Sequence, residues 1–244
     1  MIVLFTDFGV EGPYLGQVKA VLWQHAPMVP VIDLFADAPA QRPRESAYLL
    51  AAYAGAFPPG CVFLGVVDPG VGGERRAVAA RVDGRWLVGP DNGLFELMLR
   101  RGGATEQFVI APPSAGVSAS FHGRDVFAPI AGRLAAGASP AELGLGRAPL
   151  RRFDDWPDDL AAVAYVDHYG NLITGLRASV LPAAAVLTVD GRRLGRARTF
   201  SELPRGGAFW YENANGLAEL AVNCGRADAV LGAGVGTPVE LAVD

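Results

Sequence analysis

Apolar runs alternate with stretches of helical periodicity in the first part of the chain. Met1–Phe5 and Cys61–Val67 are nearly continuous apolar runs, which is typical of strands buried on both faces of a parallel sheet. Residues 13–26 instead repeat apolar side chains at the spacing of a helix, and Pro27 ends that helix. This alternation predicts an α/β fold with a mainly parallel sheet.

Further segments of the same region fit the α/β pattern. Ala77–Val82 and Trp86–Val88 flank Asp83-Gly84, a two-residue turn signal, and predict a β-hairpin. The remaining predicted elements are strands over Val29–Leu34 and Gln107–Ile110 and helices over Glu45–Ala56, Leu94–Leu99 and Val126–Leu134.

The pattern changes after about residue 150. Ala148–Asp159 contains two prolines and a polar run, and we expect it to be a linker. Short strands separated by turn signals follow it and predict a β-barrel or sandwich. We therefore expect an α/β domain over residues 1–150 and a smaller all-β domain over 151–244. The expected strands of the second domain are Ala162–Val166, Asn171–Thr174, Ala185–Val189, Phe209–Tyr211, Leu217–Val222 and Val239–Val243.

Composition narrows the classes of partner. The chain has 244 residues, 51% of them hydrophobic, which is enough for a sizeable core. Its net charge is -4 and neither half is basic, so the sequence predicts no nucleic-acid partner. No apolar stretch is long enough to span a bilayer, and the N-terminal run lacks the basic start of a signal peptide. We expect a cytoplasmic protein without membrane contact.

Cysteine and histidine spacing gives no sign of a metal or a disulfide. Cys61 and Cys224 are far apart and form no CxxC pair. His25, His122 and His168 show no spacing that is typical of metal ligands. We therefore expect neither a metal nor a cofactor.

Polar turns follow three of the predicted strands. They are Thr6–Gly9, Asp68–Gly72 and Pro90–Gly93. Ligands of open α/β sheets bind at the carboxyl ends of the strands, and parallel strands bring these ends to one edge. We therefore expect the three turns to line one cleft, with Ser120–Asp125 approaching from the same side.

The residues in these turns match no familiar nucleotide or serine-hydrolase signature. Residues 70–73 fit neither GxxxxGK[ST] nor GxGxxG, and the chain has no GxSxG elbow. What remains is Asp68, Arg75 and His122, a set of side chains suited to orienting and activating a water molecule. Structural roles stay open at this point for Asp7, as a cap, and for His122.

The motifs of the chain resemble those of the S-adenosyl-L-methionine (SAM) hydroxide adenosyltransferases. These are also called SAM hydrolases and are related to the fluorinases and chlorinases. The resemblance runs from about residue 2 to the C-terminus, with the motifs in the same order. The motifs are Phe5–Gly9, Val67–Gly72 with Glu74–Arg76, Pro90–Leu94, Phe121–Phe127, Asp167–Asn171 and Tyr211–Gly216.

The resemblance implies a fold, an assembly and a reaction. The implied fold is an N-terminal α/β domain followed by a C-terminal β-barrel-like domain. The implied assembly is a homotrimer whose active sites lie between the N-terminal domain of one subunit and the C-terminal domain of the next. The implied reaction is attack of water on the ribose C5′ of SAM, which yields adenosine and L-methionine. SAM is then the substrate, and no cofactor takes part.

The family's functional residues can be carried over motif by motif. Asp68, Arg75 and His122 match the water-activating trio. Asp7 matches a carboxylate that binds the ribose hydroxyls, and Phe8 follows it in the same substrate-binding motif. Further substrate-binding positions lie in the second domain: Asp167, Tyr169 and Asn171 at the methionine or nucleoside parts, and Tyr211, Asn213 and Ala214 near the adenine. The family usually has Ser where Ala214 stands, so a hydroxyl contact is absent there.

Two other functions remain as alternatives. Fluorinase-like enzymes have Tyr where Asp68 stands, and an ionised carboxylate repels a halide, so Asp68 favours water. Imidazole, with a reference pKa of about 6.5, suits proton transfer at neutral pH better than an ordinary aspartate at about 3.9. We therefore expect Asp68 and His122 to polarise the water together while Arg75 holds Asp68. The second alternative, a module that binds an adenosyl ligand without turnover, does not require this trio.

Overall fold

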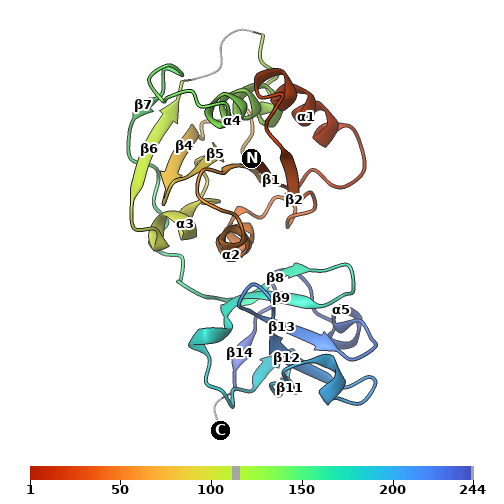
Figure 1. Cartoon of the computed structure of the whole chain (residues 1–244). Coiled ribbons are helices and arrows are strands. Elements are labelled where there is room, and N and C mark those ends of the chain that lie inside the picture. The colour runs from red at the N-terminus through yellow and green to blue at the C-terminus, as the bar shows by residue number, and fades with distance from the viewer. Residues whose placement is uncertain (112–115, 243–244) are drawn as a thin grey trace. The chain divides into compact units, whose positions relative to one another are not determined.

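The computed structural model describes residues 1–111 and 116–242, and the chain divides into two compact units. Figure 1 shows these units, Met1–Phe153 and Asp154–Asp244. The expected boundary after residue 150 lies just before this division. Each unit has a hydrophobic core of its own.

A seven-stranded sheet forms the centre of the first unit. Its strands are β1 (Ile2–Thr6), β2 (Val31–Phe35), β3 (Val62–Val66), β4 (Ala77–Val82), β5 (Arg85–Pro90), β6 (Thr105–Ile110) and β7 (Gly146–Arg147), in the spatial order β2-β1-β3-β5-β4-β6-β7. β2, β1, β3 and β5 pair in parallel, whereas β4, β6 and β7 extend the sheet with antiparallel pairs. The predicted α/β class is confirmed, with parallel pairing confined to one part of the sheet.

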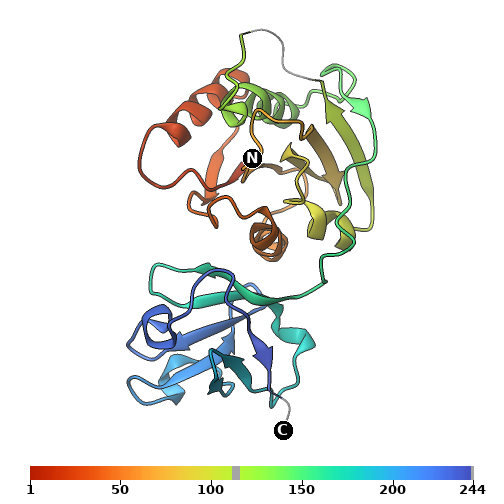
Figure 2. The same ribbon diagram turned by 180° about the vertical axis from the view of Figure 1, so that it is seen from behind.

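Helices cover both faces of this sheet. They are α1 (Tyr14–His25), α2 (Pro43–Tyr53), α3 (Glu96–Arg101) and α4 (Ala128–Ala135), with a 3-10 helix at Ala54–Ala56. Figures 1 and 2 show α1 and α4 together on one side of the sheet and α2 and α3 on the other. Val18 and Leu22 of α1 join Leu134 of α4 and Leu4 of β1 in one core cluster. The apolar stripe predicted over residues 13–26 is therefore the face that α1 buries.

The carboxyl ends of β1, β3 and β5 lie at one edge of the sheet, because these strands are parallel neighbours. Thr6 at the end of β1 pairs with Val66 at the end of β3, and Leu64 pairs with Val88 near the end of β5. The polar turns that follow these strands therefore start from the same edge, as the sequence predicts.

Two antiparallel sheets form the second unit. The strands are β8 (Leu160–Val166), β9 (Leu172–Arg177), β10 (Leu187–Val189), β11 (Arg192–Leu194), β12 (Ala208–Glu212), β13 (Leu217–Val222) and β14 (Glu240–Leu241), and the sheets have the orders β12-β13-β9-β8 and β11-β10-β14. Isolated bridges pair Ala162 of β8 with Pro238, just before β14, and Trp210 of β12 with Arg196, just after β11. The unit is therefore barrel-like, as predicted.

The structure differs from the sequence predictions at several elements. Gly123–Phe127 forms a π-helical turn before α4, where the sequence predicts a regular helix from Val126. Pro129 has no N–H to continue a regular ladder, and wider turns occur at such points. A short helix, α5 (Ala227–Leu231), and β11 are not predicted, because so few residues show no clear period. Val243, the end of the last predicted strand, lies outside the described residues.

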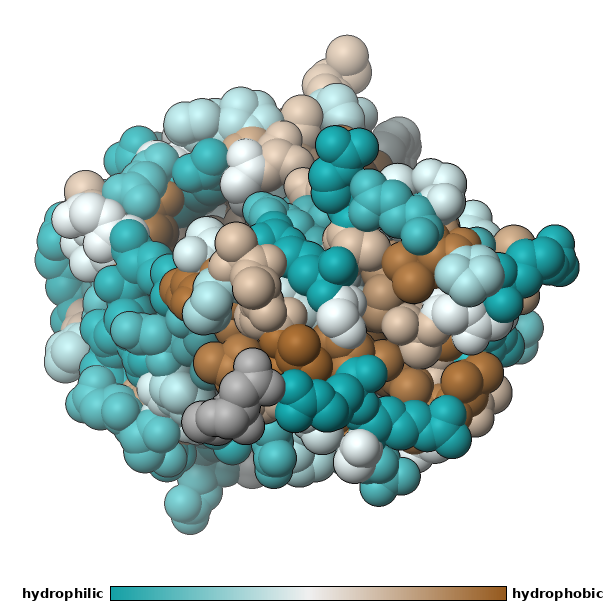
Figure 3. Space-filling model, turned by 90° about the horizontal axis from the view of Figure 1, so that it is seen from below, coloured by the Kyte–Doolittle hydropathy of each residue, from teal (hydrophilic) through white to brown (hydrophobic). Residues whose placement is uncertain are grey.

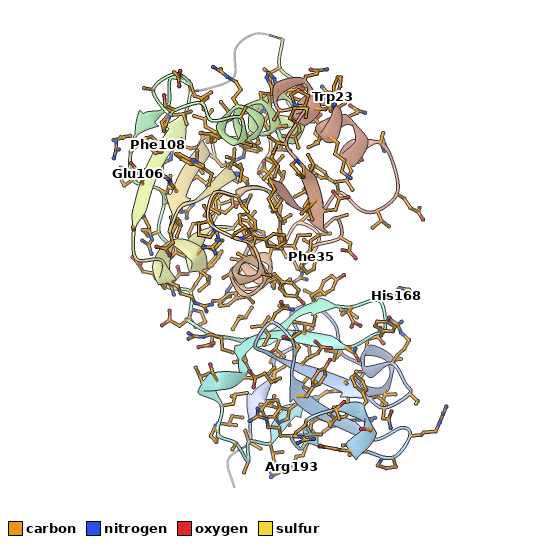
Figure 4. All side chains as sticks on the ribbon, in the orientation of Figure 1. Trp23, Phe35, Glu106, Phe108, His168 and Arg193 are labelled. Atoms are coloured by element: carbon orange, nitrogen blue, oxygen red, sulfur yellow. The ribbon has the colours of Figure 1, made fainter. Side chains whose placement is uncertain are left out.

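Large apolar side chains occur both in the cores and at the surface. Figure 3 shows brown hydrophobic residues gathered between teal hydrophilic ones on one face of the molecule. Trp23 projects from α1 in Figure 4 and is 67% exposed, whereas Trp210 of β12 is 0% exposed. Trp210 also donates its indole N–H to the Ala185 carbonyl oxygen at 2.9 Å. Burial, and not residue type, therefore decides what each Trp contributes to stability.

We expect Trp210→Ala to lower the free energy of unfolding of the second unit by about 3–5 kcal/mol, because it leaves a cavity and an unpaired carbonyl group. Trp23→Ala is the matched control and should change this free energy by no more than about 0.5 kcal/mol. Urea unfolding of the full chain, followed by circular dichroism, measures both. Equal effects of the two substitutions would contradict the burial argument.

Candidate active site

The Asp68 carboxylate and the Arg75 guanidinium form a nearly buried ion pair. Asp68 follows β3, and Arg75 lies in the loop before β4. Arg75 Nε donates to both carboxylate oxygens at 3.0 Å, and Nη2 donates to Oδ2 at 2.5 Å. The Arg75 and Asp68 side chains are only 11% and 5% exposed. These charge-assisted hydrogen bonds fix the orientation of both groups.

His122 completes this cluster from the segment before α4. Its Nδ1 lies 2.8 Å from Arg75 Nη2. Because a guanidinium can only donate, Nδ1 is the acceptor, and the neutral imidazole carries its proton on Nε2. From the reference pKa of imidazole, His122 is expected at the level of sequence to be a proton acceptor. The geometry instead makes its Nε2–H a hydrogen-bond donor.

Burial and neighbouring charge favour the neutral form of His122. Burial lowers the pKa of His122 from its usual value of 6.5, and the positive charge of Arg75 lowers it further. The carboxylates of Asp68 and Asp125 oppose this change. The imidazole is therefore uncharged at neutral pH and keeps its proton on Nε2. Arg75 also lies over the ring of Phe127, 5.2 Å from the centroid.

Asp7 and Phe8 follow β1 at the same edge of the sheet. The Gln41 backbone N–H donates to Asp7 Oδ2 at 2.8 Å. Burial raises the pKa of Asp7, the Gln41 hydrogen bond opposes this increase, and the charge of Asp68 adds to it. The Phe8 ring packs edge-on against Phe121, with centroids 5.8 Å apart. The turn after β1 thus contacts the segment that carries His122.

Close backbone packing holds the loop between Asp68 and Arg75. Gly72 has a φ of 77°, and a Cβ at this position would lie 2.5 Å from the Ala119 carbonyl oxygen. Only glycine fits this approach. Asn92 Nδ2 donates to the Val67 carbonyl oxygen at 2.8 Å. The turn after β5 therefore supports the strand end that carries Asp68.

The second unit contains a pocket of about 560 Å³. Four of the predicted substrate-binding residues line it: Asp167, Tyr169, Asn171 and Tyr211. Asp167 accepts hydrogen bonds from the Asn171 backbone N–H at 2.8 Å and from Asn171 Nδ2 at 3.0 Å. Glu219 of β13 also lines the pocket, although no sequence motif singles it out. Its position between apolar residues of a predicted strand is the one available signal.

Asn213 and Ala214 are not among the residues that line this pocket. Asn213 Oδ1 accepts from the backbone N–H groups of Asn215 at 2.9 Å and Leu217 at 3.0 Å. These bonds shape the turn between β12 and β13. Ala214 lies in the same turn and offers only backbone groups to a ligand.

The described residues include no group of three or more His, Cys, Asp or Glu side chains that could hold a metal ion. His168 lies in the turn between β8 and β9, as Figure 4 shows, and belongs to no such group among the described residues. Within the same described ranges, every helix is too short or too polar to cross a membrane.

Family models match both units. The SAM hydroxide adenosyltransferase N-terminal domain matches residues 2–144, and the corresponding C-terminal domain matches residues 161–240. The chain belongs to the SAM hydroxide adenosyltransferase family. The resemblance that the sequence motifs indicate is thus confirmed.

Individual proteins of this family match along nearly the whole chain. One from Thermus thermophilus, named (R)-S-adenosyl-L-methionine hydrolase, is 43% identical over 98% of each chain. One of the same name from Salinispora arenicola is 39% identical over 93% of this chain and 91% of its own. A crystal structure of an uncharacterized conserved protein from Thermotoga maritima has 29% identity, a TM-score of 0.88 and 100% coverage of both chains. The family and the fold therefore agree over both units.

We expect His122 to titrate below 6.5 in an NMR pH titration, because burial and Arg75 both disfavour its charged form. Arg75→Met should raise the pKa of His122, since the cation is lost while Asp68 remains. Arg81→Met, at an exposed position on β4, is the control and should leave the titration unchanged. The resonance is assigned by its loss in His122→Gln. A pKa of His122 that is unchanged in Arg75→Met would refute the contact between the two side chains.

Proposed function

We propose that this protein hydrolyses S-adenosyl-L-methionine to adenosine and L-methionine. The observation that carries the proposal is the constrained set of Asp68, Arg75 and His122 in a chain that belongs to this family. The relatives named (R)-S-adenosyl-L-methionine hydrolase support the same reaction. A protein that only binds an adenosyl ligand has no need for a nearly buried carboxylate held by an arginine.

In the proposed reaction, a water oxygen forms a bond to the ribose C5′ as the C5′–S bond breaks. The sulfonium leaves as a neutral thioether, so no acid is needed at sulfur. Asp68 accepts a hydrogen bond from the attacking water and orients its lone pair toward C5′. As the C–O bond forms, the oxygen becomes an oxonium and acidifies strongly, so a carboxylate is basic enough to take the proton. The proton then passes to solvent.

Arg75 and His122 have supporting roles in this proposal. Arg75 fixes both oxygens of Asp68 and, through Nδ1, the ring of His122. His122 then offers its Nε2–H as a donor to the water oxygen or to a ribose oxygen. Asp7, the next carboxylate along this edge of the sheet, binds the ribose hydroxyls, and Phe8 lies beside the nucleoside.

The assembly and location form part of the same proposal. We propose a cytoplasmic homotrimer that uses no cofactor, with SAM as its small-molecule partner. Support comes from the family and from the division of the predicted site residues. Asp7, Phe8, Asp68, Arg75 and His122 belong to the first unit, and the other predicted residues to the second.

We expect the purified protein to convert SAM to equal amounts of adenosine and methionine, as measured by chromatography. Asp68→Asn should lower kcat by about 100-fold or more, because the amide neither accepts the proton nor pairs with Arg75. Asp190→Asn makes the same chemical change in an exposed turn of the second unit and should leave kcat unchanged. Full turnover by Asp68→Asn would end the proposed role of Asp68.

We expect chloride to yield no 5′-chloro-5′-deoxyadenosine from SAM, because the Asp68 carboxylate repels an anion at the position of the attacking water. Sulfate at the same ionic strength controls for salt effects on the rate. Chlorinated nucleoside that forms in proportion to chloride would favour the halogenase alternative.

A further inference from the structure

A buried carboxylate, Glu219, holds the Tyr211 hydroxyl group at the pocket in the second unit. Glu219 is 4% exposed and lies on β13. The Tyr211 hydroxyl donates to its Oε1 at 2.5 Å, and Asn213 Nδ2 donates to its Oε2 at 3.0 Å. Burial raises the pKa of Glu219, and these two hydrogen bonds oppose the increase. The carboxylate thus accepts hydrogen bonds from a side chain on β12 and from one directly after it.

These contacts determine which hydrogen-bonding groups the pocket offers to a ligand. A carboxylate only accepts, so the hydroxyl hydrogen of Tyr211 is used by Glu219 and Tyr211 Oη can only accept a further bond. Asp167 similarly takes the backbone N–H of Asn171 and a hydrogen of its Nδ2. A hydrogen bond from the Asn171 side chain also opposes the rise in the pKa of Glu219. Asp167 and Glu219 thereby use both hydrogens of Asn171 Nδ2, and Asn171 Oδ1 is the atom left for a ligand. The pocket lining that results is rich in acceptors.

The remaining lining suits a flat ring. The aromatic side chains of Tyr169, Phe200 and Tyr211 line the pocket together with these acceptors. Rings of this kind pack well against a planar heterocycle. A ligand that satisfies the acceptors must carry N–H donors on that ring.

We propose that Glu219 is a specificity-determining residue that, through Tyr211, makes the pocket prefer a 6-amino purine to a 6-oxo purine. The choice of a purine rests on the proposed function, since the adenosyl part of SAM carries the amino group. A 6-oxo group would place its own acceptor opposite the acceptors of the pocket and leave both unpaired. Such a mismatch lowers affinity more than the loss of an apolar contact does.

Calorimetric binding of adenosine and inosine to the full-length protein tests this proposal. We expect the wild type to bind adenosine at least about tenfold more tightly than inosine. Glu219→Gln should reduce this ratio at least about fivefold, because the glutamine amide can donate to Tyr211 and release its hydroxyl hydrogen to the pocket. Tyr211→Phe removes the hydroxyl and should reduce the ratio as well. Glu240→Gln, an exposed change of the same kind on β14, should leave it unchanged.

Hydrolysis of SAM, followed in parallel, separates this inference from the proposed function. In Glu219→Gln we expect KM for SAM to rise while kcat stays within about threefold, because Glu219 acts on binding and lies outside the water-activating cluster. Equal affinity of the wild type for the two nucleosides, or no binding of either, overturns the inference even where SAM is hydrolysed. An absence of hydrolysis alongside a clear preference for adenosine overturns the function alone. If Glu219→Gln does not fold, Tyr211→Phe decides the outcome.

Discussion

The ion pair between Asp68 and Arg75 is the interaction on which the first unit's site depends. Withdrawing two charges from water is costly, and the pair persists only because its hydrogen bonds are well formed and both groups have further partners. Arg75 meets this demand with three hydrogen bonds to Asp68 and one to His122. The consequence is a carboxylate whose orientation does not depend on the substrate. A preoriented acceptor is what a reaction with water at a carbon centre needs.

The same constraint explains why the surrounding loop has so little freedom. The loop from Asp68 to Arg75 must return on itself within a few residues, and Gly72 allows it to approach the Ala119 carbonyl group. Asn92 anchors its first strand end from the neighbouring turn. Parallel pairing of β1, β3 and β5 supplies the common edge from which these turns start. The site thus depends on the parallel topology of the sheet, because the turns that follow antiparallel neighbours would lie at opposite edges.

Much of this arrangement could be predicted from the sequence because it depends on local signals. Continuous apolar runs mark β1 and β3, and the polar residue that ends each run marks the site edge. The role of His122 could not be predicted, since it depends on which ring nitrogen faces Arg75. Glu219 is a harder case. All residues of β13 are buried, so an alternation of buried and exposed positions does not distinguish Glu219. Only the pairing of β13 with β12 places it beside Tyr211.

The two units fix hydrogen positions by opposite means. In the first, a cation that can only donate determines that Asp68 and His122 Nδ1 accept. In the second, an anion that can only accept determines that Tyr211 and Asn213 donate. In both, the group with a single possible role is nearly buried, so water does not compete for its partners. The ambiguous groups, an imidazole, a phenol and an amide, are thereby reduced to one state each. Such fixed polarity allows a site to distinguish ligands of nearly identical shape, because a mismatched donor or acceptor has no alternative partner.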